Sequence, residues 1–341
     1  MIRKKGSYVI EYDGKSMVSA FAKEDMSDEV FQRLRKQYYT QPNINDVINE
    51  FKGLKNGGVK NSAITKFYVK DLIAKTKIWY NKWCIEDVFK CKDLCSHFYY
   101  KFHDNKDRNV KIYPLDKDDI TNLETAFRLG GKGIASKPAN FPIKTVKEIL
   151  KHYNVNNIWY DPSCGWGGRL CGALASEVTY LGTDPNYILV DRLKRMARDY
   201  NKVNNTNIKV DIRDCGSEEF QQDWVNKVGL CFTSPPYFYL EDYKIGKQSY
   251  TEGTTYEDWL FKFLKPTMEN CYKYLIDGGY YAININNFKD FNLVEDTYNL
   301  ALSVGFEFVE NRLLKNIKRV NSAKRFNDND EKIMIFKKKG S

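Results

Sequence analysis

The 341 residues are 42% hydrophobic and 29% charged, a composition that can bury a sizeable core and argues against global disorder. A formal net charge of +10 favours a polyanionic partner such as a nucleic acid. The basic start runs into polar residues, and no stretch of about 18 apolar residues occurs, so we expect neither a signal peptide nor a membrane span. The eight cysteines are scattered, which is typical of free thiols in a cytoplasmic protein.

Residues 1–134 read as a basic, mostly helical domain. Ser27 and Asn43 stand where capping side chains begin two helices, and residues 63–89 keep the helical spacing of apolar side chains. Two helices across a glycine turn, with lysines on one side, predict either a DNA-binding unit or an ordinary solvated face.

Residues 135–341 alternate instead between short apolar runs and helical stretches. The runs, which we expect to be strands, are residues 158–160, 179–182, 208–212, 229–232 and 280–285. Helices are expected at residues 169–176, 188–201, 218–225 and 256–275, and a final strand pair at 306–314 and 332–337. This repetition predicts an α/β fold with a doubly wound, mainly parallel Rossmann-like sheet. Ligands of such a sheet meet the loops at the carboxyl ends of its strands.

The first such loop, residues 161–168, is rich in glycine. Gly165 and Gly167 allow the backbone to pass close to a ligand, although a nucleotide phosphate or a plain tight turn would use them equally well. No third glycine follows at the spacing of a pyrophosphate-binding loop. Asp161 would repel phosphate and attract the aminoacyl end of S-adenosylmethionine.

Carboxylates also follow the next two runs. Asp184 lies close to the offset of about 20 residues at which an acidic side chain accepts from ribose hydroxyls. Asp214, beside Cys215, is placed to accept from an adenine amino group. Any one of these carboxylates can be a helix cap or a turn residue, but three in series predict an adenosine ligand.

After the fourth run the chain reads Thr233-Ser234-Pro235-Pro236-Tyr237. Two prolines cannot continue a central strand, and they hold the neighbouring residues in fixed positions. Ser234 Oγ and the Pro235 carbonyl can accept from an exocyclic amino group and align its lone pair with an incoming methyl group. Tyr237 can stack on a base swung out of the helix. The alternative is a rigid turn beside a surface tyrosine.

These two loops resemble the signatures of the amino-group DNA methyltransferases, which methylate cytosine N4 or adenine N6. The catalytic signature, Ser/Asp/Asn-Pro-Pro-Tyr/Phe, is matched by residues 234–237. The cofactor signature, Asp-Pro-Phe-x-Gly-x-Gly, is matched except at Ser163, where an aromatic residue is common. A family element that precedes the cofactor loop is loosely matched at Asn140 and Phe141. The resemblance covers roughly residues 135–338.

The resemblance implies an enzyme that transfers methyl groups from S-adenosylmethionine to DNA, which we expect to be double-stranded. The expected cofactor-binding residues are Asn140, Phe141, Asp161, Ser163, Gly165, Gly167, Asp184, Asp214, Cys215 and Thr233. The motif order leaves target recognition to residues 1–134. A restriction-modification setting implies a prokaryotic cell or a phage-infected host.

The first residue of the Ser-Pro-Pro-Tyr motif, Ser234, bears on which base atom is methylated. Serine there is more typical of N4-cytosine enzymes, whereas Asp or Asn is more typical of N6-adenine enzymes. Methylation at cytosine C5 is disfavoured, because that reaction requires a Pro-Cys nucleophile and none of the nine prolines precedes a cysteine.

Candidate nucleic-acid contacts lie outside these loops. They are Lys66 and Lys70 in the first domain, Tyr239 after the Pro-Pro-Tyr motif, and Lys318, Arg319, Lys324 and Arg325 between the last two strands. For the last four, the alternative is an ordinary solvated loop. The polar and aromatic residues 239–256 can close over the substrate. Cys91 and Cys95 form one zinc-like pair without a second, so we expect buried thiols and no metal.

Two other functions stay open. RNA and protein-amide N-methyltransferases use similar Asn/Asp-Pro-Pro-Tyr loops, and a DNA-binding protein can keep the fold without the chemistry. Ser234 counts against the first, and the two intact loops count against the second.

Overall fold

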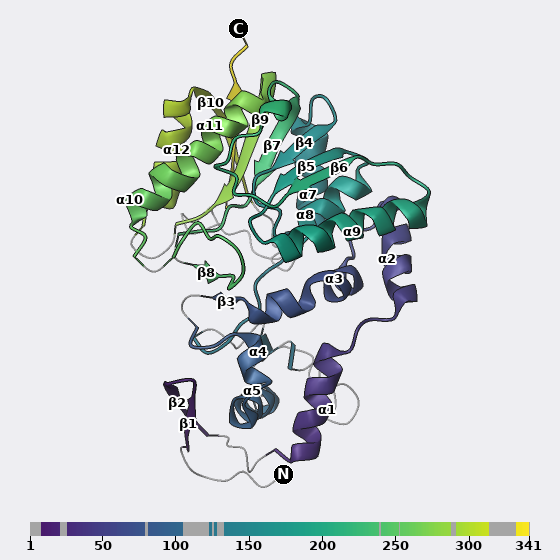
Figure 1. Cartoon of the computed structure of the whole chain (residues 1–341), viewed down its shortest axis with the longest axis vertical. Coiled ribbons are helices and arrows are strands. Elements are labelled where there is room, and N and C mark those ends of the chain that lie inside the picture. Colours follow the sequence, from purple (N-terminus) through teal and green to yellow (C-terminus); the bar gives the residue numbers. More distant parts are fainter. Residues whose placement is uncertain are drawn as a thin grey trace, which may run out of the picture. The chain divides into compact units, whose positions relative to one another are not determined.

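The computed structural model of the chain is shown in Figure 1. It describes residues 8–20, 26–78, 81–104, 123–124, 126–127, 133–238, 240–251, 253–287, 291–313 and 332–340. The chain divides into two compact units. Unit 1 takes Met1–Gln41, Lys70–Ala139 and Tyr239–Lys244, and unit 2 takes Pro42–Val69, Asn140–Phe238 and Ile245–Ser341. This division differs from the predicted one at residue 134, because residues 42–69 join the unit that holds the large sheet.

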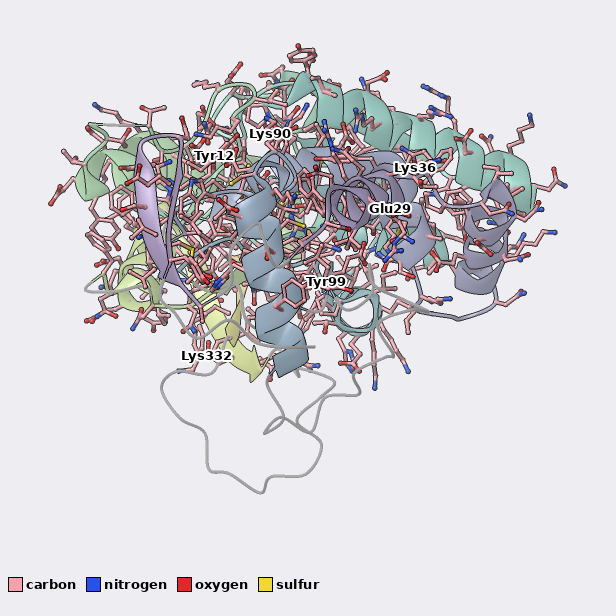
Figure 2. The ribbon with its side chains drawn as sticks, turned by 90° about the horizontal axis from the view of Figure 1, so that it is seen from below. Tyr12, Glu29, Lys36, Lys90, Tyr99 and Lys332 are labelled. Atoms are coloured by element: carbon pink, nitrogen blue, oxygen red, sulfur yellow. The ribbon has the colours of Figure 1, made fainter. Side chains whose placement is uncertain are left out.

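Unit 1 combines helices with two small sheets. Its elements are β1 (Tyr8–Tyr12), β2 (Lys15–Ser19), α1 (Asp28–Tyr39), the second part of α3 (Ser62–Lys75), β3 (Lys77–Ile78), α4 (Ile85–Val88), α5 (Lys92–Asp104) and β8 (Glu241–Asp242). The predicted cap of α1 is confirmed, since the Val30 N–H donates to Ser27 Oγ at 3.2 Å. The side chains that α1 buries in the core of unit 1 are Phe31, Leu34 and Tyr38. Figure 2 labels Glu29 and Lys36 on α1 and Tyr99 on α5.

The β1–β2 hairpin is an element that the sequence analysis missed. Its turn is Asp13-Gly14, whose φ angles are 52° and 68°, between the paired residues Tyr12 and Lys15. An Asp-Gly pair between alternating polar and apolar residues is the strongest local signal of a hairpin. The signal was therefore present in the sequence.

The helix predicted at residues 63–89 is interrupted, since β3 and other non-helical residues separate α3 from α4. α3 ends at Lys75, and Thr76 Oγ1 donates back to the Leu72 carbonyl at 3.0 Å. The chain then enters β3, which pairs antiparallel with β8. β8 lies just after the catalytic motif in sequence, so pairing with a distant segment overrides the local helical spacing.

Unit 2 is built on a sheet whose described strands have the order β10-β11-β9-β7-β4-β5-β6. Their bounds are β4 (Ile158–Asp161), β5 (Thr179–Thr183), β6 (Val210–Arg213), β7 (Val228–Thr233), β9 (Leu275–Ile285), β10 (Phe306–Leu313) and β11 (Lys332–Lys338). The first five pair in parallel, whereas β11 pairs antiparallel with β9 and with β10. The predicted α/β, mainly parallel Rossmann-like sheet is confirmed, as is the antiparallel strand pair at its end.

The direction of winding reverses beside β4. From β4 the chain moves outward to β5 and β6, then returns to β7 on the other side of β4 and continues to β9. Because such crossovers are right-handed, a reversal puts helices on both faces of the sheet, which is the doubly wound arrangement. The carboxyl ends of β4 and β7 flank the switch point, where open α/β sheets bind their ligands.

The helices of unit 2 are α2 (Ile44–Lys55), the first part of α3, α7 (Ile143–Tyr153), α8 (Gly168–Ala175), α9 (Tyr187–Asn204), α10 (Tyr256–Asp258), α11 (Lys265–Tyr274) and α12 (Leu293–Val304). α8 packs on α7 and α9, α2 packs on α8 and α9, and α11 packs on α12 (Figure 1). The helix predicted at residues 218–225 is wrong, because a 3₁₀ turn, Gln222–Trp224, takes its place. A π-helical turn, Trp259–Leu264, joins α10 to α11.

Within the described ranges, no helix is both long and apolar enough to cross a membrane.

Candidate active site

The loops that carry the predicted cofactor and catalytic residues lie at one edge of the sheet. β4 and β7 are parallel neighbours, so the loop after β4 (residues 161–168, the glycine loop) and the loop after β7 (residues 233–237, the catalytic loop) start side by side. β5 and β6 end at the same edge and are followed by Asp184 and Asp214. The structure therefore brings the predicted loops together at the switch point.

The glycine loop approaches its neighbours too closely for side chains. Gly167 has a φ of 81°, and a Cβ there would lie 3.0 Å from the side chains of Leu193 and Met196 on α9. A Cβ on Gly168 would overlap the Asn140 side chain and lie 2.5 Å from the Phe141 carbonyl. These two glycines let the amino-terminal end of α8 pack tightly, as expected of a ligand-binding turn.

Asp161 is fully buried and its charge is compensated within unit 2. Arg169 Nε and the Tyr180 hydroxyl each donate to Asp161 Oδ2 at 2.8 Å, and the Ser163 N–H donates to Oδ1 at 3.3 Å. Arg169 also donates to the Ser163 carbonyl. Asp161 was expected to repel phosphate and to attract the aminoacyl end of S-adenosylmethionine, and its pairing with Arg169 leaves less of its charge to act on either ligand.

Arg169 is a site residue that the sequence analysis did not recognise. Its side chain is 6% exposed, and its guanidinium carbon lies 5.5 Å from the centre of the Phe141 ring. Although burial opposes the charge, Asp161 raises the pKa of Arg169. An arginine within the apolar run of α8 is the signal that could have revealed it, since arginine is rarely buried without a partner.

Asn140 and Phe141 connect the glycine loop to the rest of unit 2. Asn140 Oδ1 accepts from the Gly168 N–H, and Asn140 Nδ2 donates to Thr65 Oγ1 on α3, both at 3.0 Å. The Phe141 ring packs edge-on against Phe232 of β7 at 5.5 Å. The loosely matched family element thus contacts the glycine loop and the strand that leads into the catalytic loop. Its contact with a cofactor stays a prediction.

The carboxylates after β5 and β6 differ in their surroundings. Asp184 is partly buried, and burial raises the pKa of its carboxyl to about 6, although the N–H groups of Asn186 and Gly165 donate to it. Asp214 is exposed. Beside it, burial and then the nearby Glu219 raise the pKa of the Cys215 thiol to about 11, so the thiol is neutral near pH 7.

The catalytic loop extends a strand that is buried throughout. Thr233 is buried, and its Oγ1 has no hydrogen-bond partner among the described residues. Ser234 and Tyr237 are half-exposed, so both can meet a substrate from the open side. Asn284 Nδ2, on the neighbouring strand β9, donates to Ser234 Oγ at 3.2 Å. Asn284 is a second residue of the site that no sequence motif revealed.

Phe238 anchors the far end of the catalytic loop. Its ring is buried among four other aromatic rings, with centroids at 5.2 Å from Tyr250, 5.4 Å from Tyr256, 6.2 Å from Trp259 and 4.9 Å from Phe291. Tyr256 donates in turn to Asp296 at 2.7 Å. The loop is therefore held at one end by the sheet and at the other by this aromatic cluster.

The segment predicted to close over the substrate divides between the two units. Within unit 2, a Cβ on Gly246 would overlap the Pro185 carbonyl just after Asp184, and Lys247 pairs with Glu218 at 2.8 Å. This part lies beside the segments that follow β5 and β6. Within unit 1, β8 pairs with β3.

Of the predicted nucleic-acid contacts, the structure describes Lys66 and Lys70. Lys70 lies 3.2 Å from the Glu124 carboxylate and 4.0 Å from the Tyr38 ring centre, with 12% of its side chain exposed. It is therefore a structural ion pair in unit 1 and does not support the predicted phosphate contact. Lys66 is half-buried. Outside the described residues lie Tyr239, Lys318, Arg319, Lys324 and Arg325.

No metal centre is found in the parts of the chain that the structure describes, where no three His, Cys, Asp or Glu side chains group closely enough. Cys95 is buried, and burial raises the pKa of its thiol to about 12. Cys91 is half-buried.

A doubly wound sheet with a glycine loop after its first strand and a Pro-Pro-Tyr loop after its fourth has the Rossmann-like architecture whose ligands bind at the switch point. Residues 228–341 match the N6/N4 methyltransferase family model, described as DNA methylase. The match includes the catalytic loop and covers about a third of the chain.

Solved structures with a similar fold share little sequence with the chain. A TehB-like S-adenosylmethionine-dependent methyltransferase from Corynebacterium glutamicum is 17% identical, with a TM-score of 0.38 over 59% of this chain and 89% of that one. The [4+2]-cyclase SpnF is 10% identical, with a TM-score of 0.41 over 58% and 82%. A geranyl diphosphate methyltransferase is 11% identical, with a TM-score of 0.39 over 57% and 76%. No curated protein matches the chain. These TM-scores are low, so the fold assignment rests on the strand order of the chain itself.

Proposed function

We propose that the protein transfers a methyl group from S-adenosylmethionine to an exocyclic amino group of a base in double-stranded DNA, with cytosine N4 favoured over adenine N6. The observation that carries the proposal is the Ser234-Pro235-Pro236-Tyr237 loop beside the glycine loop at the switch point, in which all residues but Pro235 are half-exposed. The serine at its head supports cytosine.

The residues at the sheet edge suit S-adenosylmethionine. The glycine loop lets the backbone approach the methionine end, Asp184 is an acceptor for ribose hydroxyls, and the exposed Asp214 is an acceptor for the adenine amino group. Asp161 is already paired with Arg169, so it would position the loop more than supply a free charge. When bound, S-adenosylmethionine supplies an electrophilic methyl group.

The chain's own part in the reaction is positioning. Ser234 Oγ and the Pro235 carbonyl accept from the exocyclic amino group, and Tyr237 stacks on the base once it has left the helix. The amino nitrogen forms its new bond to the methyl carbon as the bond from that carbon to sulfur breaks. The amino group then loses a proton to solvent. No thiol nucleophile is required, in keeping with the neutral Cys215 thiol.

We assign target reading to unit 1. Its helix α1 exposes Arg35 and Lys36, and Figure 2 labels Lys36 on this helix. Deleting residues 1–134 would also remove α2 and the first part of α3 from unit 2, so deletion is not a clean test. An Arg35→Gln/Lys36→Gln variant should weaken duplex DNA binding and leave cofactor affinity unchanged. If the variant and the unsubstituted protein bind duplex DNA equally tightly, α1 does not take part in target reading.

The test of the reaction is transfer of tritiated methyl groups to unmodified genomic DNA, total RNA and a protein extract in parallel. We expect label in DNA, followed by N4-methylcytosine in a mass-spectrometric analysis of its nucleosides. N6-methyladenine would change the target base and keep the reaction class. Label in RNA or protein alone would refute the DNA assignment.

A further inference from the structure

A buried amide reaches the catalytic loop from the neighbouring strand. Asn284 is on β9, which lies between β7 and β11 in the sheet, and its side chain is 1% exposed. In the parallel register Thr233 is opposite Ile283, so Ser234 and Asn284 each come directly after the last residue pair of the β7–β9 ladder. Asn284 Nδ2 donates to Ser234 Oγ at 3.2 Å.

Asn284 is a buried amide in an otherwise apolar stretch of β9. Ala282, which shares its face of the sheet, and Ile283 and Ile285 on the opposite face are all fully buried. An amide taken out of water costs free energy unless it is hydrogen-bonded, and a branched apolar side chain would fill the same space without that cost. The hydrogen bond to Ser234 gives the amide a role that an apolar residue could not take.

The bond restricts what the Ser234 hydroxyl can do. A hydroxyl has one hydrogen to donate and two lone pairs to accept with, and it rotates freely unless a partner fixes it. Donation from Asn284 occupies one lone pair on the buried side. The second lone pair is then left for a donor on the half-exposed side, where the catalytic loop would meet a substrate.

We infer that Asn284 is a positioning residue that holds Ser234 Oγ as a preorganised acceptor for the exocyclic amino group. This inference rests on the proposed function. It assigns to β9 a part in the reaction that the Ser-Pro-Pro-Tyr motif does not contain.

The test is a double-mutant cycle of the full-length protein with Asn284→Ala, Ser234→Ala and the double variant. We expect Asn284→Ala to lower kcat about tenfold, the usual scale for one preorganised hydrogen bond, with the KM for S-adenosylmethionine unchanged. In the Ser234→Ala background the same change should have no further effect on kcat, because the hydroxyl that it positions is absent. Affinity for S-adenosylhomocysteine, measured by calorimetry, should be equal in all four proteins.

Two controls separate positioning from loss of structure. Asn284→Leu keeps the number and branching of the side-chain heavy atoms and removes the donor, so it should reproduce the kcat loss of Asn284→Ala even if the alanine variant loses stability. Asn204→Ala removes another buried amide, which donates to the Phe51 carbonyl at 3.2 Å, and should lower stability without changing kcat.

The outcomes distinguish the two levels of the proposal. Suppose that the unsubstituted protein methylates DNA and that the kcat loss of the double variant equals the product of the two single losses. Asn284 then acts independently of Ser234, so the inference fails while the proposed function stands. If Asn284→Leu retains full kcat, the inference also fails. If the unsubstituted protein transfers no methyl group to DNA, the proposed function fails and takes the inference with it.

Discussion

The glycine loop and the catalytic loop end neighbouring parallel strands, but their polar groups are used differently. In the glycine loop, the side chain of Asp161 and the backbone of Ser163 are bonded to Arg169, and the Gly168 N–H is bonded to Asn140. In the catalytic loop, two prolines stiffen the backbone and Ser234 stays half-exposed, with Asn284 donating to it.

This difference in hydrogen bonding suits the two loops to different tasks, ligand binding and reaction. A loop whose charge is paired internally is rigid before ligand arrives, and it offers backbone and shape more than charge. A loop with a half-exposed hydroxyl beside a tyrosine offers groups to a reacting amine. Changes in the glycine loop should therefore lower stability and cofactor affinity, and changes in the catalytic loop should lower the rate.

The largest effect is expected from Arg169→Met. It leaves the Asp161 carboxylate buried without its cationic partner, which should lower the free energy of unfolding by about 3–5 kcal/mol. Denaturant unfolding measures the loss. Adding Asp161→Asn should recover part of it, since the uncompensated charge is then gone. Lys262→Met, which breaks an exposed pair with Asp258, serves as the control and should change little. Equal stability of Arg169→Met and the unsubstituted protein would contradict the comparison.

Tyr237→Ala should act on the rate instead. Loss of base stacking is expected to lower kcat/KM for DNA about tenfold to a hundredfold, the equivalent of about 1–3 kcal/mol. Affinity for S-adenosylhomocysteine should be unchanged. Tyr237→Phe keeps the ring and should retain most of the activity in the same tritium assay. Full activity of the alanine variant would mean that another loop holds the base.

Cofactor affinity should depend on pH through Asp184. Burial raises the pKa of this carboxyl to about 6, and the protonated form is a weaker acceptor for ribose hydroxyls. Affinity should therefore fall as the pH drops below about 6, approaching tenfold per pH unit. Calorimetric titration with S-adenosylhomocysteine between about pH 5 and pH 7 measures this, and Asp184→Asn should remove the dependence. A flat profile in the unsubstituted protein would exclude Asp184 as the ribose acceptor.

The stability of the free protein should respond to the same group with the opposite sign. Because the folded-state pKa lies above the ordinary value of 3.8, the folded state holds this proton more tightly than the unfolded state does. The contribution of Asp184 to the free energy of unfolding is therefore fully present below about pH 4 and is lost as the pH rises to about 6.

The smallest effect is expected at Lys247. This residue lies in the segment after the catalytic loop and pairs with Glu218, which follows β6. Its pair with Glu218 is 2.8 Å long, but 66% of the lysine side chain is exposed, so the pair should contribute at most about 1 kcal/mol. Lys247→Gln should raise the cofactor dissociation rate by no more than about fivefold, and high salt should abolish the difference. A larger change in stopped-flow measurements would mean that this segment holds the ligand directly.

Much of the fold could be predicted because its signals are local. Ser27 begins α1 as expected, the strand-forming runs of unit 2 all become strands, and the final hairpin forms. The hairpin at Asp13-Gly14 carried an equally local signal that was overlooked. The helix predicted through residue 89 is interrupted for another reason, since β3 pairs with β8, a partner far away in sequence.

The sequence by itself determined the order of the elements, the glycine and catalytic loops, and their meeting at the carboxyl ends of β4 and β7. Each depends on residues a few positions apart, or on the general rule that parallel strands end at one edge. Only the tertiary structure decided that Arg169 neutralises Asp161, that Asn284 faces Ser234, and that residues 42–69 belong with the sheet. Those facts depend on contacts between residues distant in sequence, whose partners no local pattern encodes.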